Sequence, residues 1–267
     1  MGRIAERFAA LRAAGERALI PFITAGDPDL ATTEALVPAL VEAGADAVEI
    51  GVPFSDPLAD GPTIQRASER ALRSGTSLRD VLGLVEGLRA RVDVPLILMG
   101  YANNFLALGG GEFAERASAA GVDGIIVVDL PPEAGAPLFE PAIAHGIDPI
   151  LLAAPTTRAA RLELLTRETR GFLYYVSITG VTGARAEGVQ DVEAAVGRIR
   201  ALSEVPVCVG FGVSTPDHAK RVGRFADGVV VGSALVERIA EAKDREAAVK
   251  VAGTFVAELK EALRGLA

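Results

Sequence analysis

The stretch EIGVPFSDPLADGP, residues 49–62, carries three carboxylates: Glu49, Asp56 and Asp60. It begins as an apolar strand and ends in a loop rich in proline and glycine. Glu49 stands near the end of the strand and Asp60 stands in the loop, so the two side chains can converge on one substrate. General acid and base catalysis requires that arrangement. The spacing therefore predicts a catalytic pair of carboxylates.

Side-chain alternation predicts that Glu49 points inward. In AVEIGV, residues 47–52, the three branched apolar residues share one face of the strand, and Glu49 shares the other face with Ala47 and Gly51. If the apolar face packs on helices, Glu49 points to the opposite face, into the space that the strand encloses. Burial disfavours the charged form of a carboxyl group, so we expect a raised pKa. A structural glutamate paired with a backbone amide or an arginine is the alternative.

Eight short apolar runs, bounded by glycine, proline or aspartate, predict eight strands with helical patterns between them. The runs cover residues 18–26, 46–53, 95–101, 124–130, 149–155, 172–178, 206–213 and 227–233. The 267 residues give each unit about 33, close to the length that a βαβ crossover needs. We therefore predict an α/β protein: a single (β/α)8 TIM barrel over residues 1–267, with an extra N-terminal helix.

An open, doubly wound sheet is the alternative fold for strands that alternate with helices. No Gly-x-Gly-x-x-Gly turn follows the first predicted strand. A barrel also explains Glu49 better, because residues near the carboxyl end of a barrel strand point into the mouth where that fold keeps its chemistry. The chain further shows a weak internal repeat, in which a small turn and an aspartate lead into a strand: residues 43–50, 120–127 and 225–232.

Glycine-rich turns follow the last three predicted strands, at residues 180–183, 210–214 and 232–234. Glycine lets backbone amides approach an anion, and a helix that starts after the turn adds the positive end of its dipole. Barrels bind phosphate on the loops after strands 7 and 8. Each turn alone fits a simple tight turn equally well, but three on one side of the barrel favour a phosphorylated substrate.

A flat apolar ring is the second feature that the residues suggest for the substrate. Tyr174 and Tyr175 are adjacent in one strand, so one of them faces the barrel and the other faces the helices. Four more side chains could wall a ring pocket, although each one alone also fits ordinary packing: Phe22, Met99, Ile126 and Phe211.

Composition excludes several classes of function. The chain is 50% hydrophobic and 23% charged, with a net charge of −8, which argues against nucleic-acid and anionic-membrane partners. The single cysteine, Cys208, cannot form an internal disulfide, and the two histidines have no metal-site spacing. The first twenty residues mix charges with alanines and lack the apolar run of an export signal. We expect a cytoplasmic protein without a metal ion.

Eight motifs in order resemble the tryptophan synthase alpha subunit family: PFITAGDP, EIGVPFSDPLADGPTIQ, LMGYANN, VVDLPPEA, LLAAPTT, YYVSITGVTGAR, VGFGVS and VVGSALV. The resemblance runs nearly end to end. It implies a (β/α)8 lyase of tryptophan biosynthesis that cleaves indole-3-glycerol phosphate to indole and glyceraldehyde 3-phosphate. It also implies no cofactor in this chain and a beta subunit that carries pyridoxal phosphate, consumes the indole and forms an alpha2-beta2 heterotetramer.

The same resemblance implies roles for individual residues. It places the catalytic pair at Glu49 and Asp60, and Asp56 in a loop that contacts the partner. The phosphate-binding positions are Gly183, Gly212, Gly232 and Ser233. The ring pocket comprises Phe22, Met99, Ile126, Tyr174, Thr182 and Phe211. Three alternatives stay open: a stand-alone indole-3-glycerol-phosphate lyase, another phosphate-binding barrel isomerase or cyclase, and a catalytically idle subunit that only activates a partner.

Overall fold

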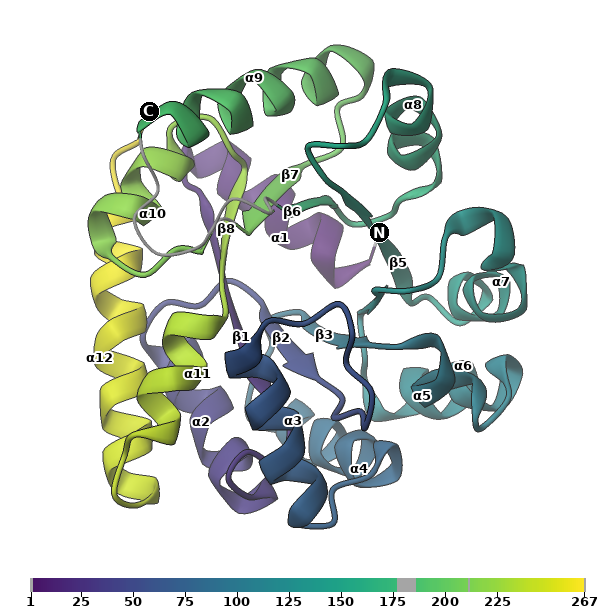
Figure 1. The fold of residues 1–267 in the computed structure, drawn as a ribbon, viewed down its shortest axis with the longest axis vertical. Coiled ribbons are helices and arrows are strands. Elements are labelled where there is room, and N and C mark those ends of the chain that lie inside the picture. Colours follow the sequence, from purple (N-terminus) through teal and green to yellow (C-terminus); the bar gives the residue numbers. More distant parts are fainter. Residues whose placement is uncertain (1, 177–185, 211, 267) are drawn as a thin grey trace.

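Eight parallel strands close into a barrel in the order of the sequence, with β8 paired to β1 (Figure 1). The structure is a computed structural model that describes residues 2–176, 186–210 and 212–266. Helices surround the strands on the outside of the barrel (Figure 1). The predicted α/β TIM barrel is therefore confirmed.

All eight predicted strands are present. They are β1 (Ala18–Thr24), β2 (Val48–Gly51), β3 (Leu96–Gly100), β4 (Gly124–Val127), β5 (Asp148–Ala153), β6 (Leu173–Val176), β7 (Val207–Gly210) and β8 (Gly228–Val231). Some are shorter than the apolar runs that predicted them. The run at residues 46–53, for example, extends past β2, because Pro53 has no N–H group to continue the hydrogen-bond ladder.

The helices alternate with the strands, and additional short helices stand at the mouth. They are α1 (Arg3–Ala14), α2 (Leu30–Glu42), α3 (Pro62–Arg73), α4 (Leu78–Arg89), α5 (Ala102–Leu106), α6 (Gly110–Ala120), the 3-10 helix η1 (Pro132–Ala134), α7 (Ala136–Ala144), α8 (Ala159–Glu168), α9 (Ala186–Leu202), α10 (Pro216–Gly223), α11 (Ser233–Ala240) and α12 (Arg245–Leu263). Among the described residues, no helix has both the length and the apolar composition to cross a membrane.

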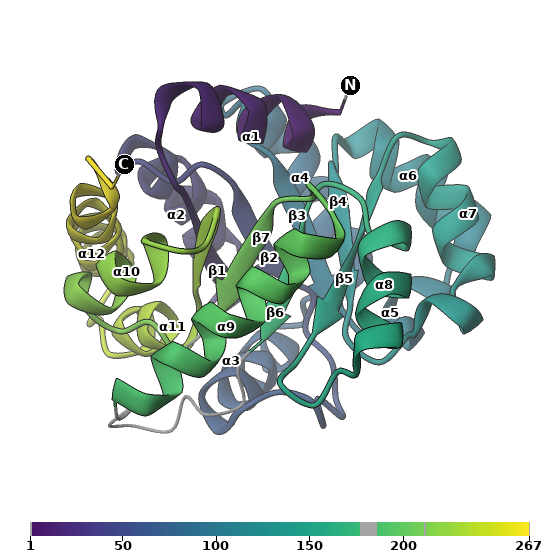
Figure 2. The ribbon, with the colours of Figure 1, turned by 90° about the horizontal axis from the view of Figure 1, so that it is seen from above.

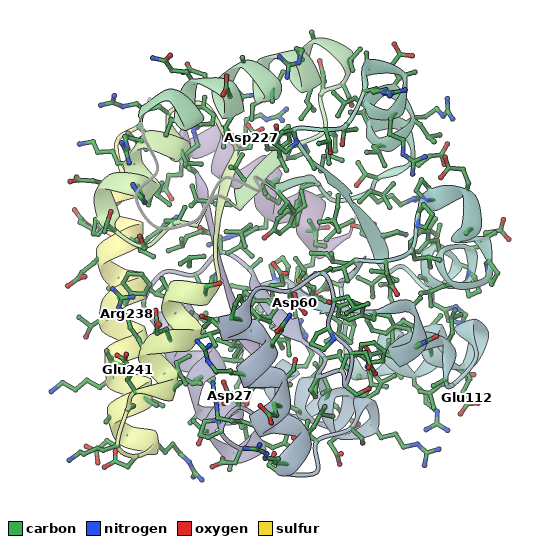
Figure 3. The ribbon with its side chains drawn as sticks, viewed as in Figure 1. Asp27, Asp60, Glu112, Asp227, Arg238 and Glu241 are labelled. Atoms are coloured by element: carbon green, nitrogen blue, oxygen red, sulfur yellow. The ribbon has the colours of Figure 1, made fainter. Side chains whose placement is uncertain are left out.

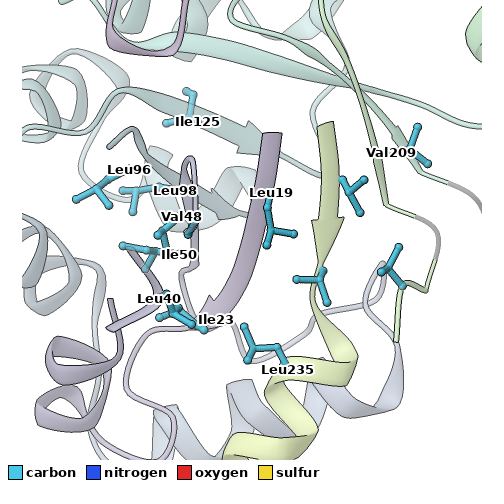
Figure 4. Close-up of a cluster of buried hydrophobic side chains, with 14 of the residues drawn as sticks. Leu19, Ile23, Leu40, Val48, Ile50, Leu96, Leu98, Ile125, Val209 and Leu235 are labelled. Carbon is cyan, nitrogen blue, oxygen red and sulfur yellow. The ribbon is translucent and has the colours of Figure 1, made fainter. Parts of the chain in front are cut away.

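The apolar side chains form an outer layer between strands and helices and an inner core within the barrel. Val48 and Ile50 lie in the outer layer (Figure 4), whereas Ala47 lies in the inner core, so the predicted alternation along β2 is confirmed. The expected N-terminal helix, α1, crosses one end of the barrel, opposite α3 (Figure 2). Its residues Ile4 and Phe8 belong to the inner core. Helix α1 therefore plugs the amino end and leaves the opposite end as the mouth.

Aspartates at the amino end of the barrel tie neighbouring strands together. The N–H group of Asp46 donates to the carbonyl of Leu19 at 2.9 Å, and the N–H group of Leu19 donates to Asp46 Oδ2 at 2.7 Å. The same pair of bonds joins Asp123 to Leu96 and Asp227 to Val207. These three aspartates are the ones in the repeated sequence segments. The internal repeat therefore encodes a repeated anchor between strands.

Basic side chains neutralise these aspartates. The Asp123 side chain is 8% exposed, and it forms ion pairs with Arg89 at 2.8 Å and with Arg3 at 2.5 Å. Arg3 also pairs with Asp93, whose side chain is 98% exposed. Asp93 and Asp123 thus share Arg3, but only Asp123 is buried. Substituting each aspartate in turn therefore tests the anchoring role of Asp123 against an exposed control.

We predict that Asp123→Ala lowers the free energy of unfolding by about 3–5 kcal/mol, because it leaves Arg89 and the Leu96 N–H group without their buried partner. The control Asp93→Ala should cost about 1 kcal/mol or less, since exposed ion pairs contribute little. Urea denaturation of both variants measures the difference. Equal losses would contradict the anchoring role of Asp123.

Candidate active site

Glu49 lies inside the barrel, near the carboxyl end of β2. The strand pairing places it beside Phe22 of β1 and Ile97 of β3. Its side chain is buried, with the residue 1% exposed. Neither carboxyl oxygen has a hydrogen-bond partner within the part of the chain that the structure describes. The predicted inward orientation is therefore confirmed, and the alternative of a glutamate paired with an arginine or amide finds no support among these residues.

Burial raises the pKa of Glu49 to about 8, and the nearby charge of Asp60 adds to the rise. A carboxyl group with this pKa holds its proton at neutral pH and can still release it. Buried carboxyl groups without a partner are rare, because the charged form loses its hydration. Glu49 can therefore act as a proton donor and, once ionised, as a proton acceptor.

Asp60 lies in the loop between β2 and α3, close to the start of α3 (Figure 3). The hydroxyl of Tyr101 donates to Asp60 Oδ2 at 3.0 Å, and the N–H group of Ala59 donates to the same hydroxyl at 3.0 Å. Burial raises the pKa of Asp60, and the bond from Tyr101 opposes the rise. One carboxylate oxygen is therefore held by Tyr101, and Oδ1 remains available to a substrate.

Tyr101, between β3 and α5, and Asn104 of α5 clamp this loop, and neither residue was among the predicted site residues. The ring of Tyr101 stacks on Phe54, with centroids 4.9 Å apart and planes at 23°. Asn104 Nδ2 donates to the carbonyl of Pro53 at 3.2 Å. The only indication of this clamp in the sequence is a tyrosine placed directly after a predicted strand. Two separate loops make the contact, so no periodicity reveals it.

Phe22 and Met99 form the apolar wall beside the carboxylates. Both pack with Ile64 of α3 at the mouth. Phe22 lies so close to Gly51 that a Cβ atom at position 51 would stand 2.6 Å from its ring. A side chain at this position would therefore displace the Phe22 ring, and glycine in the strand that carries Glu49 leaves space for an aromatic wall next to it.

Ile126 and Tyr174 extend the wall into the barrel. Both belong to the inner core, whereas Tyr175 belongs to the outer layer, so Tyr174 is the inward-facing tyrosine of β6. Its hydroxyl would lie 2.6 Å from a Cβ atom at Gly210. The charge of Glu49 contributes to the raised pKa of Tyr174, after burial. Tyr174 therefore lies within electrostatic reach of Glu49.

The predicted phosphate positions are only partly described. Ser233 is the first residue of α11, and Gly232 caps that helix. The first N–H groups of a helix have no acceptor within the helix, so they can bind an anion. Gly212 has a φ of 56°, a left-handed conformation that favours glycine. Thr182, Gly183 and Phe211 lie outside the described residues.

A narrow cavity of about 20 Å³ lies at the mouth, and Glu49, Ile126, Tyr174, Gly232 and Ser233 are not among the residues that line it. Its lining includes Phe22, Met99, Asp60 and Tyr101. Apolar surroundings strengthen electrostatic interactions between a substrate and the carboxylates. The arrangement combines an apolar wall with a proton donor, Glu49, and a hydrogen-bond acceptor, Asp60. It suits proton transfer to and from a substrate with an apolar ring.

Comparison with known proteins gives one consistent family. The family model for the tryptophan synthase alpha chain matches residues 8–264. The tryptophan synthase alpha chain of Geobacter sulfurreducens is 54% identical, over 98% of this chain and 99% of the relative. The crystal structure of the alpha subunit from Legionella pneumophila superposes with a TM-score of 0.91 at 40% identity, over 98% of both chains. A chain of tryptophan synthase from M. tuberculosis in an aminoacrylate-bound form gives 0.89 at 36% identity, over 99% of this chain and 100% of that chain.

Glu49 should make the stability of the fold depend on pH. Its pKa is about 8 when folded and near the usual 4.5 when unfolded, so between these values the folded chain holds a proton that the unfolded chain has released. The free energy of unfolding should fall by about 1.4 kcal/mol per pH unit in this window and level off above it. Urea unfolding of wild type and Glu49→Gln at several pH values measures the effect. Parallel profiles for the two proteins would rule out a buried, protonated Glu49.

Proposed function

The chain belongs to the tryptophan synthase alpha chain family, and from that premise we propose that Glu49 and Asp60 are its catalytic residues. The chain is a carbon–carbon lyase that cleaves indole-3-glycerol phosphate to indole and glyceraldehyde 3-phosphate in tryptophan biosynthesis. The observation that carries the proposal is the buried Glu49, which has no hydrogen-bond partner among the described residues and a pKa of about 8, close to the charge of Asp60.

The cleavage breaks the bond between indole C3 and the adjacent glycerol carbon. Protonated Glu49 donates its proton to C3, which converts the ring to an indolenine and places positive charge on the ring nitrogen. Asp60 accepts the hydrogen bond of the ring N–H group through Oδ1 and stabilises that charge. Ionised Glu49 then removes the proton of the glycerol hydroxyl, the carbon–carbon bond breaks as the aldehyde forms, and its electrons restore the aromatic ring.

The apolar wall and the glycine turns bind the two ends of the substrate. We propose that the indole ring packs against Phe22, Met99, Ile126 and Tyr174, with Thr182 and Phe211 as further contacts. The phosphate lies at the amino end of α11, where the N–H groups at Gly232 and Ser233 face it, together with Gly183 and Gly212. Ile126 and Tyr174 belong to the inner core of the barrel, which supports a ring site on the same inner side as Glu49.

We propose that residues 1–267 form one domain that works in the cytoplasm. This domain needs no cofactor or metal ion, because the two carboxylates supply every proton transfer. Pyridoxal phosphate belongs to the beta subunit, and the two subunits form an alpha2-beta2 heterotetramer. Nucleic acid and membranes are not partners. The M. tuberculosis relative is described as a tryptophan synthase in an aminoacrylate-bound form, which supports a pyridoxal-phosphate partner for this family.

The loop that carries Asp60 is the proposed contact with the beta subunit. Leu58 is 91% exposed, and Asp56 beside it is exposed and accepts a hydrogen bond from the Ser55 hydroxyl at 2.5 Å. An apolar side chain that stands this far into solvent is typical of an interface. Tyr101 stacks on Phe54 and donates to Asp60, so it joins this loop to the barrel. A partner that binds the loop can therefore hold Asp60 in the position that catalysis needs.

Glu49→Gln should fold and bind substrate but lose turnover by about 10²–10⁴-fold or more, because glutamine cannot transfer a proton. Asp60→Asn should lose less, since an amide oxygen still accepts the hydrogen bond of the ring nitrogen. Indole release from indole-3-glycerol phosphate, with and without a beta subunit, measures both variants. Near-normal turnover of Glu49→Gln would refute the proposed mechanism.

Gly232→Val should raise KM for indole-3-glycerol phosphate by about tenfold to a hundredfold, because the side chain occupies space that the charged phosphate needs. A Cβ atom at this position meets Phe22 only at 3.6 Å, so the fold can accept it. Position 212 is a poorer probe, since any side chain there is strained by the positive φ. The control is Gly83→Ala on the exposed face of α4, which should leave KM unchanged. An unchanged KM in Gly232→Val places the phosphate elsewhere.

Asp56→Ala and Leu58→Ser should weaken the stimulation of indole release by the beta subunit and leave binding of the substrate to the isolated chain intact. The matched control is Leu202→Ser. Leu202 is 44% exposed and ends α9, so it lies at the end of the barrel away from the mouth. Titration of each variant with a beta subunit measures the stimulation. If all three variants respond as wild type does, the loop is not part of the interface.

A further inference from the structure

Thr24 ends β1 at the mouth of the barrel, and its hydroxyl is buried. The residue is 3% exposed, and Oγ1 has no hydrogen-bond partner in the described ranges of the chain. The preceding residue, Ile23, packs in the outer layer between strands and helices. Because side chains alternate along a strand, Thr24 faces the inside of the mouth. The Thr24 hydroxyl is therefore a polar group inside the site, and a strand of the barrel fixes its position.

A nearby threonine shows what a structural hydroxyl looks like in this protein. Thr33 is equally buried, but its Oγ1 accepts a bond from the Gly26 N–H group at 3.0 Å and donates to the Asp29 carbonyl at 3.2 Å. A buried hydroxyl without a partner destabilises the fold, and native proteins keep few of them. Thr33 contributes to the structure, whereas the Thr24 hydroxyl has no such role among the described residues.

Thr24 shares its surroundings with the proposed catalytic machinery. It lines the cavity of about 20 Å³ that Asp60, Tyr101 and Ser68 also line. That space is enough for one water molecule, and the polar side chains around it supply the partners that a buried water needs. Tyr101 donates to Asp60 Oδ2, and no described residue donates to Oδ1, so both lone pairs of Oδ1 are open to further hydrogen bonds.

We propose that Thr24 is a second positioning residue for Asp60, and that its hydroxyl holds one water molecule that donates a hydrogen bond to Asp60 Oδ1. This inference rests on the proposed catalytic role of Asp60. Tyr101 from β3 and Thr24 from β1 then hold the carboxylate from two sides. The loop that carries Asp60 is attached to two fixed strands, and Oδ1 keeps its remaining lone pair for the indole N–H group.

The test compares three variants in the indole-release assay and in thermal unfolding. Thr24→Val removes the hydroxyl and keeps the shape; kcat should fall by about tenfold to a hundredfold with little change in KM, while the melting temperature stays equal to or above that of wild type. Thr24→Ser keeps the hydroxyl and should retain most of the rate. The control Thr33→Val should show the opposite pattern: a lower melting temperature and a wild-type kcat.

A double-mutant cycle with Asp60→Asn shows whether Thr24 acts through Asp60. If it does, Thr24→Val causes little further loss in the Asp60→Asn background. Wild-type kcat in Thr24→Val, equal impairment of Thr24→Ser, or losses that multiply in the double mutant would each overturn the proposal. Wild-type turnover of Asp60→Asn alone would instead refute the proposed role of Asp60, which is a separate result.

Discussion

The pairing register of β1 with β2 determines the geometry of the site, and Asp46 fixes that register. Its N–H group and its carboxylate both bond to Leu19 at the start of β1, and Lys260 and Arg7 neutralise its charge at 2.8 and 2.6 Å. With this register Phe22 stands beside Glu49. A slip of one residue would turn a strand's inward side chains outward. The chemistry at the mouth therefore depends on an anchor at the opposite end of the same strands.

The same anchor recurs around the barrel, which explains the repeat in the sequence. Asp123 and Asp227 make the equivalent pair of bonds before β4 and β8. Before β6 the contact differs: the Thr169 hydroxyl accepts a bond from the Leu151 N–H group at 3.0 Å and donates to the Phe172 carbonyl at 2.8 Å, while the Thr169 N–H group bonds to Leu165. Three of the four successive strand pairs thus share one aspartate anchor. The fourth pair is joined through a hydroxyl, so the aspartate repeat in the sequence does not extend to it.

The sequence predicts what periodicity and residue type determine, and it does not predict contacts between loops. The eight strands follow from bounded apolar runs, and the inward orientation of Glu49 follows from alternation; local sequence encodes both. The clamp from Tyr101 on Asp60 does not, because the two residues meet only after β2 and β3 have paired. The unpartnered hydroxyl of Thr24 is equally invisible, since a threonine at the end of a strand usually finds a partner and only the packed structure reveals one that does not.

The fold places two carboxyl groups in different electrostatic environments. Glu49 sits on a strand among apolar side chains, and burial together with the charge of Asp60 raises its pKa to about 8. Burial also raises the pKa of Asp60, but the Tyr101 hydroxyl stabilises its charged form. Carboxyl groups whose environments separate their pKa values can divide the roles of acid and base. The charge of Asp60 helps to keep the proton on Glu49. In the proposed mechanism, the residue that receives the ring N–H group therefore also prepares the acid that protonates the ring.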